Sequence, residues 1–94
     1  MATTEYKHGT YTIDPNTTPP PFTFWWGRDS KAPNEFFDVS IAPHVVQNMQ
    51  PLQILSKAVY WDPRPGMGIV MLLTVHNPNN FRVTFEANHV RVYS

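Results

Sequence analysis

The sequence predicts an all-β fold, a small antiparallel β-sandwich or partly open barrel of about six strands. Ten prolines lie mostly between apolar runs rather than inside them, as the loops of a strand protein require. Several runs alternate apolar and polar residues with a period of two, which is the pattern of half-buried strands. Composition does not change along the 94 residues, so residues 1–94 are expected to form a single β-domain.

The first third of the chain contains two expected strands joined by a low-complexity segment. Residues 9–13 are a first possible strand. Residues 14–21 read Asp-Pro-Asn-Thr-Thr-Pro-Pro-Pro and predict an extended, Pro/Thr-rich connecting segment. The aromatic run 22–26 follows as a second strand. Alternation within that run places Trp25 on the face opposite to its aromatic neighbours.

The middle of the chain contains one clear strand and one ambiguous segment. Residues 36–41 alternate and predict a half-buried strand. Residues 52–60 carry apolar residues at helical spacing after Pro51, yet residues 58–61 are β-prone and lead into a turn at 62–66. A strand is favoured over a helix in this segment, and the helix stays open as the alternative.

The final third predicts a β-hairpin that turns at Asn77-Pro78-Asn79-Asn80. Apolar residues occupy odd positions from 69 to 75 and again from 81 to 87. A three-residue loop would oppose Val75 to Val83 and place both apolar sets on one face. Asparagine tolerates the left-handed conformation that such a loop needs.

A second irregularity is expected near Asn88-His89. Beyond Ala87 the apolar residues move to the even positions Val90 and Val92. An extra residue in the strand would return Val90 and Val92 to the same face as Phe85 and Ala87, so the sequence predicts a β-bulge there.

Composition and charge exclude several classes of partner. Seven basic and seven acidic side chains cancel, and the basic ones are scattered, so no nucleic acid is expected. No apolar stretch approaches the roughly 20 residues of a membrane span, so no membrane insertion is expected. Without cysteine or an N-terminal signal peptide, the sequence predicts a cytoplasmic protein, with secretion as the alternative if a signal was removed.

No motif indicates catalysis, a metal or a cofactor. The histidines, His8, His44, His76 and His89, lack the close spacing of zinc ligands. There is no thiol, no nucleophile elbow and no glycine-rich phosphate loop. We therefore expect a protein that is not an enzyme, with no metal and no cofactor. A small enzyme that uses Asp38 and His44 as acid and base is a minor alternative.

The unusual feature is the aromatic content, thirteen residues in a small chain. An exposed indole can stack on a sugar ring or anchor a partner protein. The aromatic content, together with the neutral polar groups in loops, predicts a lectin-like protein that binds a neutral carbohydrate or glycoconjugate. The expected ligand-binding residues are Trp25, Trp61, His76, Asn79 and Asn80.

Two forms of association are compatible with this composition. A sugar-binding protein of this size is expected to form a homodimer or larger homo-oligomer, because several sites together gain avidity. The alternative is a structural or protein-interaction module that self-assembles through its exposed aromatics and binds no small ligand.

Overall fold

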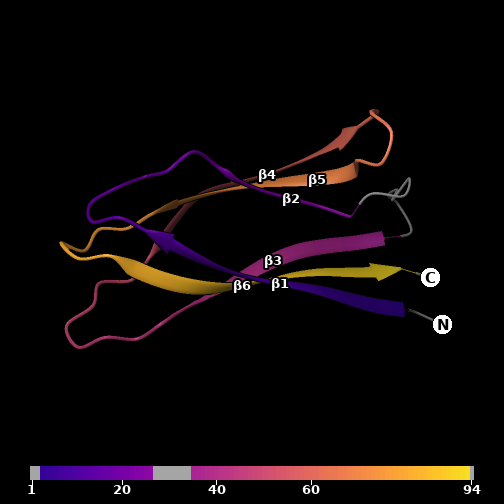
Figure 1. Ribbon diagram of the computed structural model, residues 1–94. Helices are drawn as coiled ribbons and strands as arrows, with labels where there is room; N and C mark the ends of the chain where they lie inside the picture. The colour runs from indigo at the N-terminus through magenta and orange to yellow at the C-terminus, as the bar shows by residue number, and fades with distance from the viewer. Residues whose placement is uncertain (1–2, 27–34, 94) are drawn as a thin grey trace.

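The computed structural model describes residues 3–26 and 35–93, which form six antiparallel strands in two packed three-stranded sheets (Figure 1). The predicted all-β sandwich is confirmed. Among the described residues no helix is long and apolar enough to cross a membrane. The strands are β1 (Thr3–Ile13), β2 (Phe22–Trp25), β3 (Glu35–Pro43), β4 (Gln53–Asp62), β5 (Gly68–His76) and β6 (Val83–Tyr93).

Each sheet is built around one central strand. In the first sheet, β6 lies between β1 and β3, and its pairing with β1 runs from Thr3↔Tyr93 to Ile13↔Val83. In the second sheet, β5 lies between β2 and β4. The pairing of β4 with β5 contains one irregularity, between Ile54 and Ser56. The four outer strands β1, β2, β3 and β4 are the sheet edges.

The core lies between the two central strands. Alternate residues of β5 and β6, including Leu73 and Phe85, are fully buried there. Aromatic rings from the edge strands complete the core, because Tyr11 and Phe22 pack 5.1 Å apart and Phe22 meets Phe85 edge to face at 5.5 Å. The alternation expected for residues 22–26 and 36–41 is confirmed, since Phe24, Trp26 and Val39 are buried and Trp25 is exposed.

The expected hairpin at residues 77–80 is wrong, because β5 and β6 belong to different sheets. The chain crosses from one sheet to the other at this point, in an arch. Val75 and Val83 do share the core, but they face it from opposite layers instead of pairing side by side. The left-handed asparagines of the described chain are Asn16 and Asn48, with φ of 50° and 61°, and they lie outside this loop.

A buried side chain, Asn77, holds the arch in place. Its amide nitrogen donates to the backbone oxygens of Ile13 (3.2 Å), Asp14 (3.1 Å) and Phe81 (2.9 Å). Its amide oxygen accepts from the backbone and side-chain nitrogens of Asn79. Asn77 thus joins the end of β1 to both ends of the arch, which explains why a polar residue occupies a fully buried position.

The hairpin of this fold lies instead between β4 and β5. The Asp62 carboxylate accepts from the backbone nitrogen of Arg64 at 3.0 Å and from its guanidinium at 2.6 Å. Gly66 follows with φ of 83°, which only glycine adopts without strain. Residues 53–62 are strand throughout, so the strand expected here is confirmed over the helix.

The bulge expected near Asn88-His89 is also wrong. The β1–β6 register continues without a shift, with Lys7 opposite His89. His89 and Arg91 therefore point into the sandwich, and Val90 and Val92 point outward. The change in apolar positions reflects buried polar residues at the inner face and not an extra residue in the strand.

Candidate functional site

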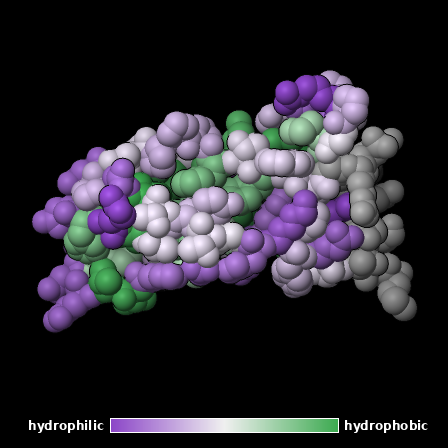
Figure 2. Space-filling view, viewed as in Figure 1, coloured by the Kyte–Doolittle hydropathy of each residue, from purple (hydrophilic) through white to green (hydrophobic). Residues whose placement is uncertain are grey.

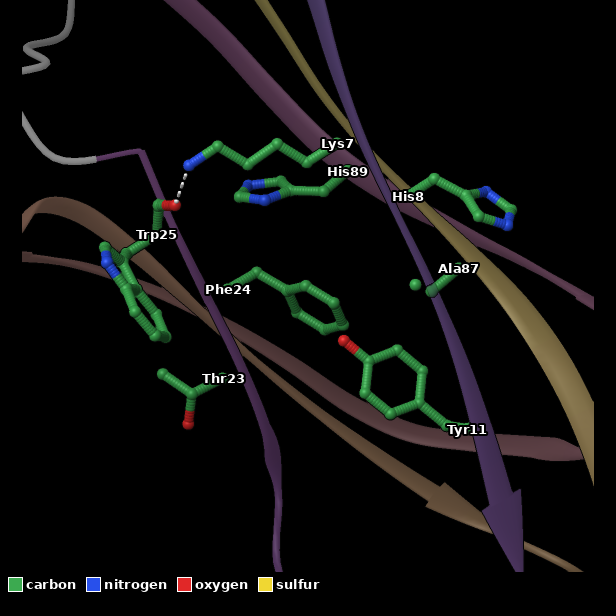
Figure 3. A pocket seen from close by; sticks show the side chains of 9 residues that line it. Lys7, His8, Tyr11, Thr23, Phe24, Trp25, Ala87 and His89 are labelled. Carbon is green, nitrogen blue, oxygen red and sulfur yellow. Dashed lines mark hydrogen bonds between the residues drawn. The ribbon is translucent and has the colours of Figure 1, made fainter.

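A pocket of about 260 Å³ opens between the edges of the two sheets, where β1 faces β2 across the end of β6. Figure 2 shows apolar side chains in the band between the two layers, bordered by polar residues of the outer faces. Figure 3 shows the side chains around the pocket. Its lining consists of Lys7, His8, Gly9, Tyr11, Thr23, Phe24, Trp25, Ala87 and His89.

His89 forms part of the inner wall of this pocket. Its ring packs against Phe24, with centroids 5.4 Å apart, and against Trp26 at 4.7 Å. Burial, and to a smaller extent the charge of Lys7, lowers the pKa of His89 to about 4. His89 is therefore a neutral imidazole at pH 7, able both to donate and to accept a hydrogen bond.

Lys7 ties the two sheet edges together at one end of the pocket. Its Nζ donates to the backbone oxygen of Trp25 at 3.0 Å, and it lies 4.6 Å from the centroid of the Trp26 ring. The lysine charge is thus directed at a carbonyl and an aromatic face. Beyond Lys7 is a second cavity of about 220 Å³, lined also by Glu5, Trp26 and Arg91.

Gly9 makes room for the ring of Tyr11. A Cβ atom at position 9 would lie 2.8 Å from the Tyr11 hydroxyl and 3.0 Å from its Cε2, closer than such atoms approach each other. The absence of a side chain at Gly9 lets the Tyr11 ring fold back beneath β1. The Tyr11 hydroxyl then points towards Phe24 at the centre of the pocket (Figure 3).

Trp25 and Thr23 leave β2 on the side opposite to Phe24. Trp25 is 46% exposed, and on the adjacent strand its partner is Val70. Val70 also pairs with Tyr60 of β4 and is completely buried although it faces outward. Trp25 and Tyr60 therefore flank Val70 on the outer face of the second sheet, and both rings are partly exposed on that face.

The structure separates the ligand-binding residues expected from the sequence. Trp25 lines the pocket, whereas Trp61 is half-exposed on the opposite face of its sheet. His76 lies six residues along β5 from the partner of Trp25, roughly 20 Å away at about 3.3 Å per residue. There its Nδ1 lies 2.7 Å from Thr18 Oγ1.

The two asparagines of the arch also lie at that far end. The Asn79 side chain is buried and exchanges two hydrogen bonds with the backbone of Gln50, at 2.7 and 3.0 Å. Its amide is used within the fold, and Asn80 is exposed without being near the pocket lining. Of the five residues expected to bind a ligand, only Trp25 lines the pocket.

A separate polar cluster covers the outer face of the first sheet. The Glu86 carboxylate lies 2.7 Å from His8 Nε2 and 2.6 Å from His44 Nε2, and it accepts from Thr10. These three hydrogen bonds lower the pKa of Glu86, and bonds with Asn88 and Glu86 raise the pKa of His8. His8 therefore turns its ring away from the pocket (Figure 3).

Two expectations about reactive groups concern this region. Asp38 pairs with Lys57 at 3.1 Å, whereas His44 pairs with Glu86, so the structure does not unite Asp38 and His44 as an acid and base. Within residues 3–26 and 35–93, no group of three His, Asp or Glu side chains has the arrangement of a metal site.

Sequence reasoning missed most of the pocket. The first strand was expected to begin at Gly9, but β1 begins at Thr3, so Lys7 was left outside any strand. Extending the period of two backwards from Ile13 through Tyr11 and Gly9 to Lys7 would have placed all four on the inner face.

No protein-family model, curated protein or solved structure matches this chain. What the pocket can do follows from its own groups. Its interior offers the Tyr11 hydroxyl and the neutral imidazole of His89, while the Trp25 indole is exposed at the rim, on the outer side of β2. These groups suit binding of a small uncharged polar molecule.

Proposed function

We propose that this protein binds a neutral carbohydrate at the β1–β2 pocket and does not catalyse a reaction. The observation that supports the proposal is the position of a half-exposed Trp25 at the rim of a pocket whose interior holds the Tyr11 hydroxyl and the neutral His89 imidazole. A sugar ring needs both, because its C–H face stacks on an aromatic ring while its hydroxyls exchange hydrogen bonds.

The charges around the pocket favour an uncharged ligand. His89 is neutral at pH 7, and His8 is directed towards Glu86 on the other side of β1. The ammonium group of Lys7 already contacts the Trp25 carbonyl and the Trp26 ring. No carboxylate belongs to the lining, so a neutral sugar meets neither repulsion nor an open counter-charge.

The size of the pocket suits one sugar ring. Pockets for drug-sized ligands have volumes of roughly 300–1,000 Å³, and this pocket of about 260 Å³ is smaller. Further rings of a glycan would lie outside, along the outer face that carries Trp25 and Tyr60. A small shallow site of this kind binds weakly, so a homodimer or larger homo-oligomer would add avidity towards a glycoconjugate.

Replacing Trp25 tests the proposal directly. We expect Trp25→Ala to weaken sugar binding about fivefold, because a lost aromatic stacking contact costs on the order of 1 kcal/mol. A glycan array identifies the sugar, and titration of tryptophan fluorescence measures its Kd. Trp61→Ala is the matched control, since Trp61 is similarly exposed but lies outside the pocket, and its single-site Kd in the fluorescence titration should equal that of the wild type.

A second variant alters the pocket without touching an indole. Gly9→Ala should displace the Tyr11 ring and reduce sugar affinity, while a thermal melt reports whether the fold is retained. If the wild type shows no response to any sugar at millimolar concentration, carbohydrate binding is excluded.

Self-assembly without a small ligand is the second candidate function. The observation that favours it is a run of exposed apolar side chains along β4, far more than a surface strand normally carries. Under this alternative, assembly is retained and no sugar binds.

A further inference from the structure

Both faces of β4 are open to solvent. Every residue from 53 to 61 is exposed, although alternate residues of a sandwich strand normally face the core. The register places Val59 and Trp61 on the inner side of the sheet, yet they are 55% and 51% exposed. The opposing sheet thus leaves the inner side of β4 uncovered.

Large apolar side chains occupy this open strand on both sides. Tyr60 is exposed on the outer side, and Ile54 and Leu55 are exposed near the irregularity at the start of the strand. The unfavourable contact of these groups with water is a driving force for association.

The outer backbone edge of β4 is also available. Among the described residues, β4 pairs with β5 on one side and with no strand on the other. Its N–H and C=O groups on that side form a template for another strand, which natural proteins usually protect with charges, prolines or bulges. Beyond Ser56 the pairing is regular to Asp62, so this part of the edge carries none of those protections except its charges.

The charges of β4 are neutralised within the chain. Lys57 pairs with Asp38 at 3.1 Å, and Asp62 pairs with Arg64 at 2.6 Å. A second strand can therefore approach β4 without meeting an unbalanced charge.

We propose that β4 pairs antiparallel with β4 of a second copy of this chain, which joins the two β2-β5-β4 sheets into one continuous sheet. A second copy fits because antiparallel pairing about a two-fold axis sets β4 against the same strand of the other copy, so one apolar strand complements itself. The zero net charge of the chain adds no long-range repulsion between copies.

The exposed surface of β4 is large enough for a small dimer interface. Five large side chains, each about half-exposed, and a ten-residue backbone edge together offer roughly 600 Å² per partner, the low end for specific interfaces. A two-fold axis perpendicular to the sheet keeps every residue on its own face. Val59 and Trp61 of one copy therefore meet odd-numbered residues of the other, and Tyr60 meets even-numbered ones.

This inference gives the proposed assembly a surface and does not depend on sugar binding. Sedimentation at about 100 µM should show a dimer for the wild type, since that concentration populates a complex with micromolar Kd. Val59→Lys should shift the protein to monomer, because it places a charged side chain of each copy within the apolar strand interface without disturbing a buried contact. Tyr6→Lys, at an exposed aromatic residue of β1, is the matched control and should remain dimeric.

Cross-linking provides a second readout, because the chain has no cysteine of its own. Single cysteines at Ala58, Val59 and Tyr60 should cross-link strongly at one position only, the residue on the two-fold axis, since a disulfide needs Cα atoms about 4.4–6.8 Å apart.

The outcomes separate this proposal from the others. A monomeric wild type would overturn both assembly and the β4 interface, and β4 would then be an edge for an extended segment of another protein. A dimer that Val59→Lys leaves intact would overturn the β4 interface but not assembly. Sugar titration of the same variants reports on the pocket independently.

Discussion

His89 shows how a polar residue can be part of an aromatic core. Its ring lies between Phe24 and Trp26, with Lys7 nearby, and only the neutral form suits that position. The same neutrality makes the residue useful at the pocket wall, because a neutral imidazole can bind a hydroxyl without attracting anions.

Acid should destabilise the fold through His89. The unfolded chain takes up a proton at this residue near pH 6.5, whereas the folded protein does so only near pH 4. Stability is therefore lost as the pH falls from about 6.5 to 4, by an amount on the order of 2 kcal/mol. Urea denaturation over this pH range measures the slope, which His89→Leu should largely remove.

The cluster of Glu86 with His8, His44 and Thr10 changes stability mainly below pH 4.5 and above pH 6.5. The lowered pKa of Glu86 adds stability that is present above its ordinary value of 4.5 and is lost below it. The raised pKa of His8 adds stability that is complete below 6.5 and is lost at higher pH. An equal slope between pH 4.5 and 6.5 in wild type and His89→Leu would contradict the role given to His89.

At the scale of elements, the β5–β6 arch depends on one amide. Asn77 accepts and donates at the junction of β1, the arch and β6, and its side chain has no exposure to water. Removing this side chain leaves several buried backbone groups without a hydrogen-bond partner. Each such group lowers the free energy of unfolding by about 1–3 kcal/mol.

Asn77→Ala should therefore destabilise the protein by roughly 3 kcal/mol, which lowers Tm by about 15 °C in a domain of this size. Differential scanning calorimetry measures the change. Asn80→Ala, at an exposed position three residues away, is the control and should cost less than about 0.5 kcal/mol. Similar melting of the two variants would show that Asn77 does not hold the arch.

The arch also marks what sequence reasoning could and could not predict. Alternation identified which residues of β5 and β6 are buried, such as Leu73 and Phe85, because a period of two depends only on facing the core. It could not tell whether two core-facing strands pair side by side or face each other across the core, since both arrangements need the same pattern. What distinguishes them is the pairing of β5 with β2 and β4 and of β6 with β1 and β3, and most of these partners are distant in the sequence.

The same limit affected the candidate site. Trp25 was found because its exposure follows from alternation alone. The pocket was missed because it depends on β1 lying beside β2 across the open side of the sandwich, and no local pattern reports which sheet edges become neighbours. Asn79 was expected to contact a ligand because a loop asparagine offers neutral hydrogen-bonding groups, but its side-chain amide bonds with the backbone of Gln50.

At the scale of the whole molecule, stability should differ sharply between central and edge strands. β5 and β6 are paired on both sides and bury most of the core, whereas β4 is paired on one side and exposed on both faces. Hydrogen exchange should therefore be slowest in β5 and β6, with protection near that of global unfolding. The amides of β4 that point away from β5 should exchange fastest among the strands.

Hydrogen exchange would also detect association of two copies through β4. Protection of the outward-pointing amides of β4 that grows with protein concentration would indicate strand pairing between copies. Rapid exchange in β6, comparable with that in β4, would contradict the two-sheet arrangement.

The topology of the first sheet has a consequence for the order of folding. β1 and β3 both pair with β6, and among the described residues they pair with no other strand. During synthesis on the ribosome, neither β1 nor β3 can pair until β6 has been made, and the β1–β6 contacts span as many as 90 positions, from Thr3 to Tyr93. The β4–β5 hairpin is local and can form earlier. Such long-range pairing slows folding and leaves apolar strands exposed in the meantime, so the nascent chain is most vulnerable to aggregation just before β6 emerges.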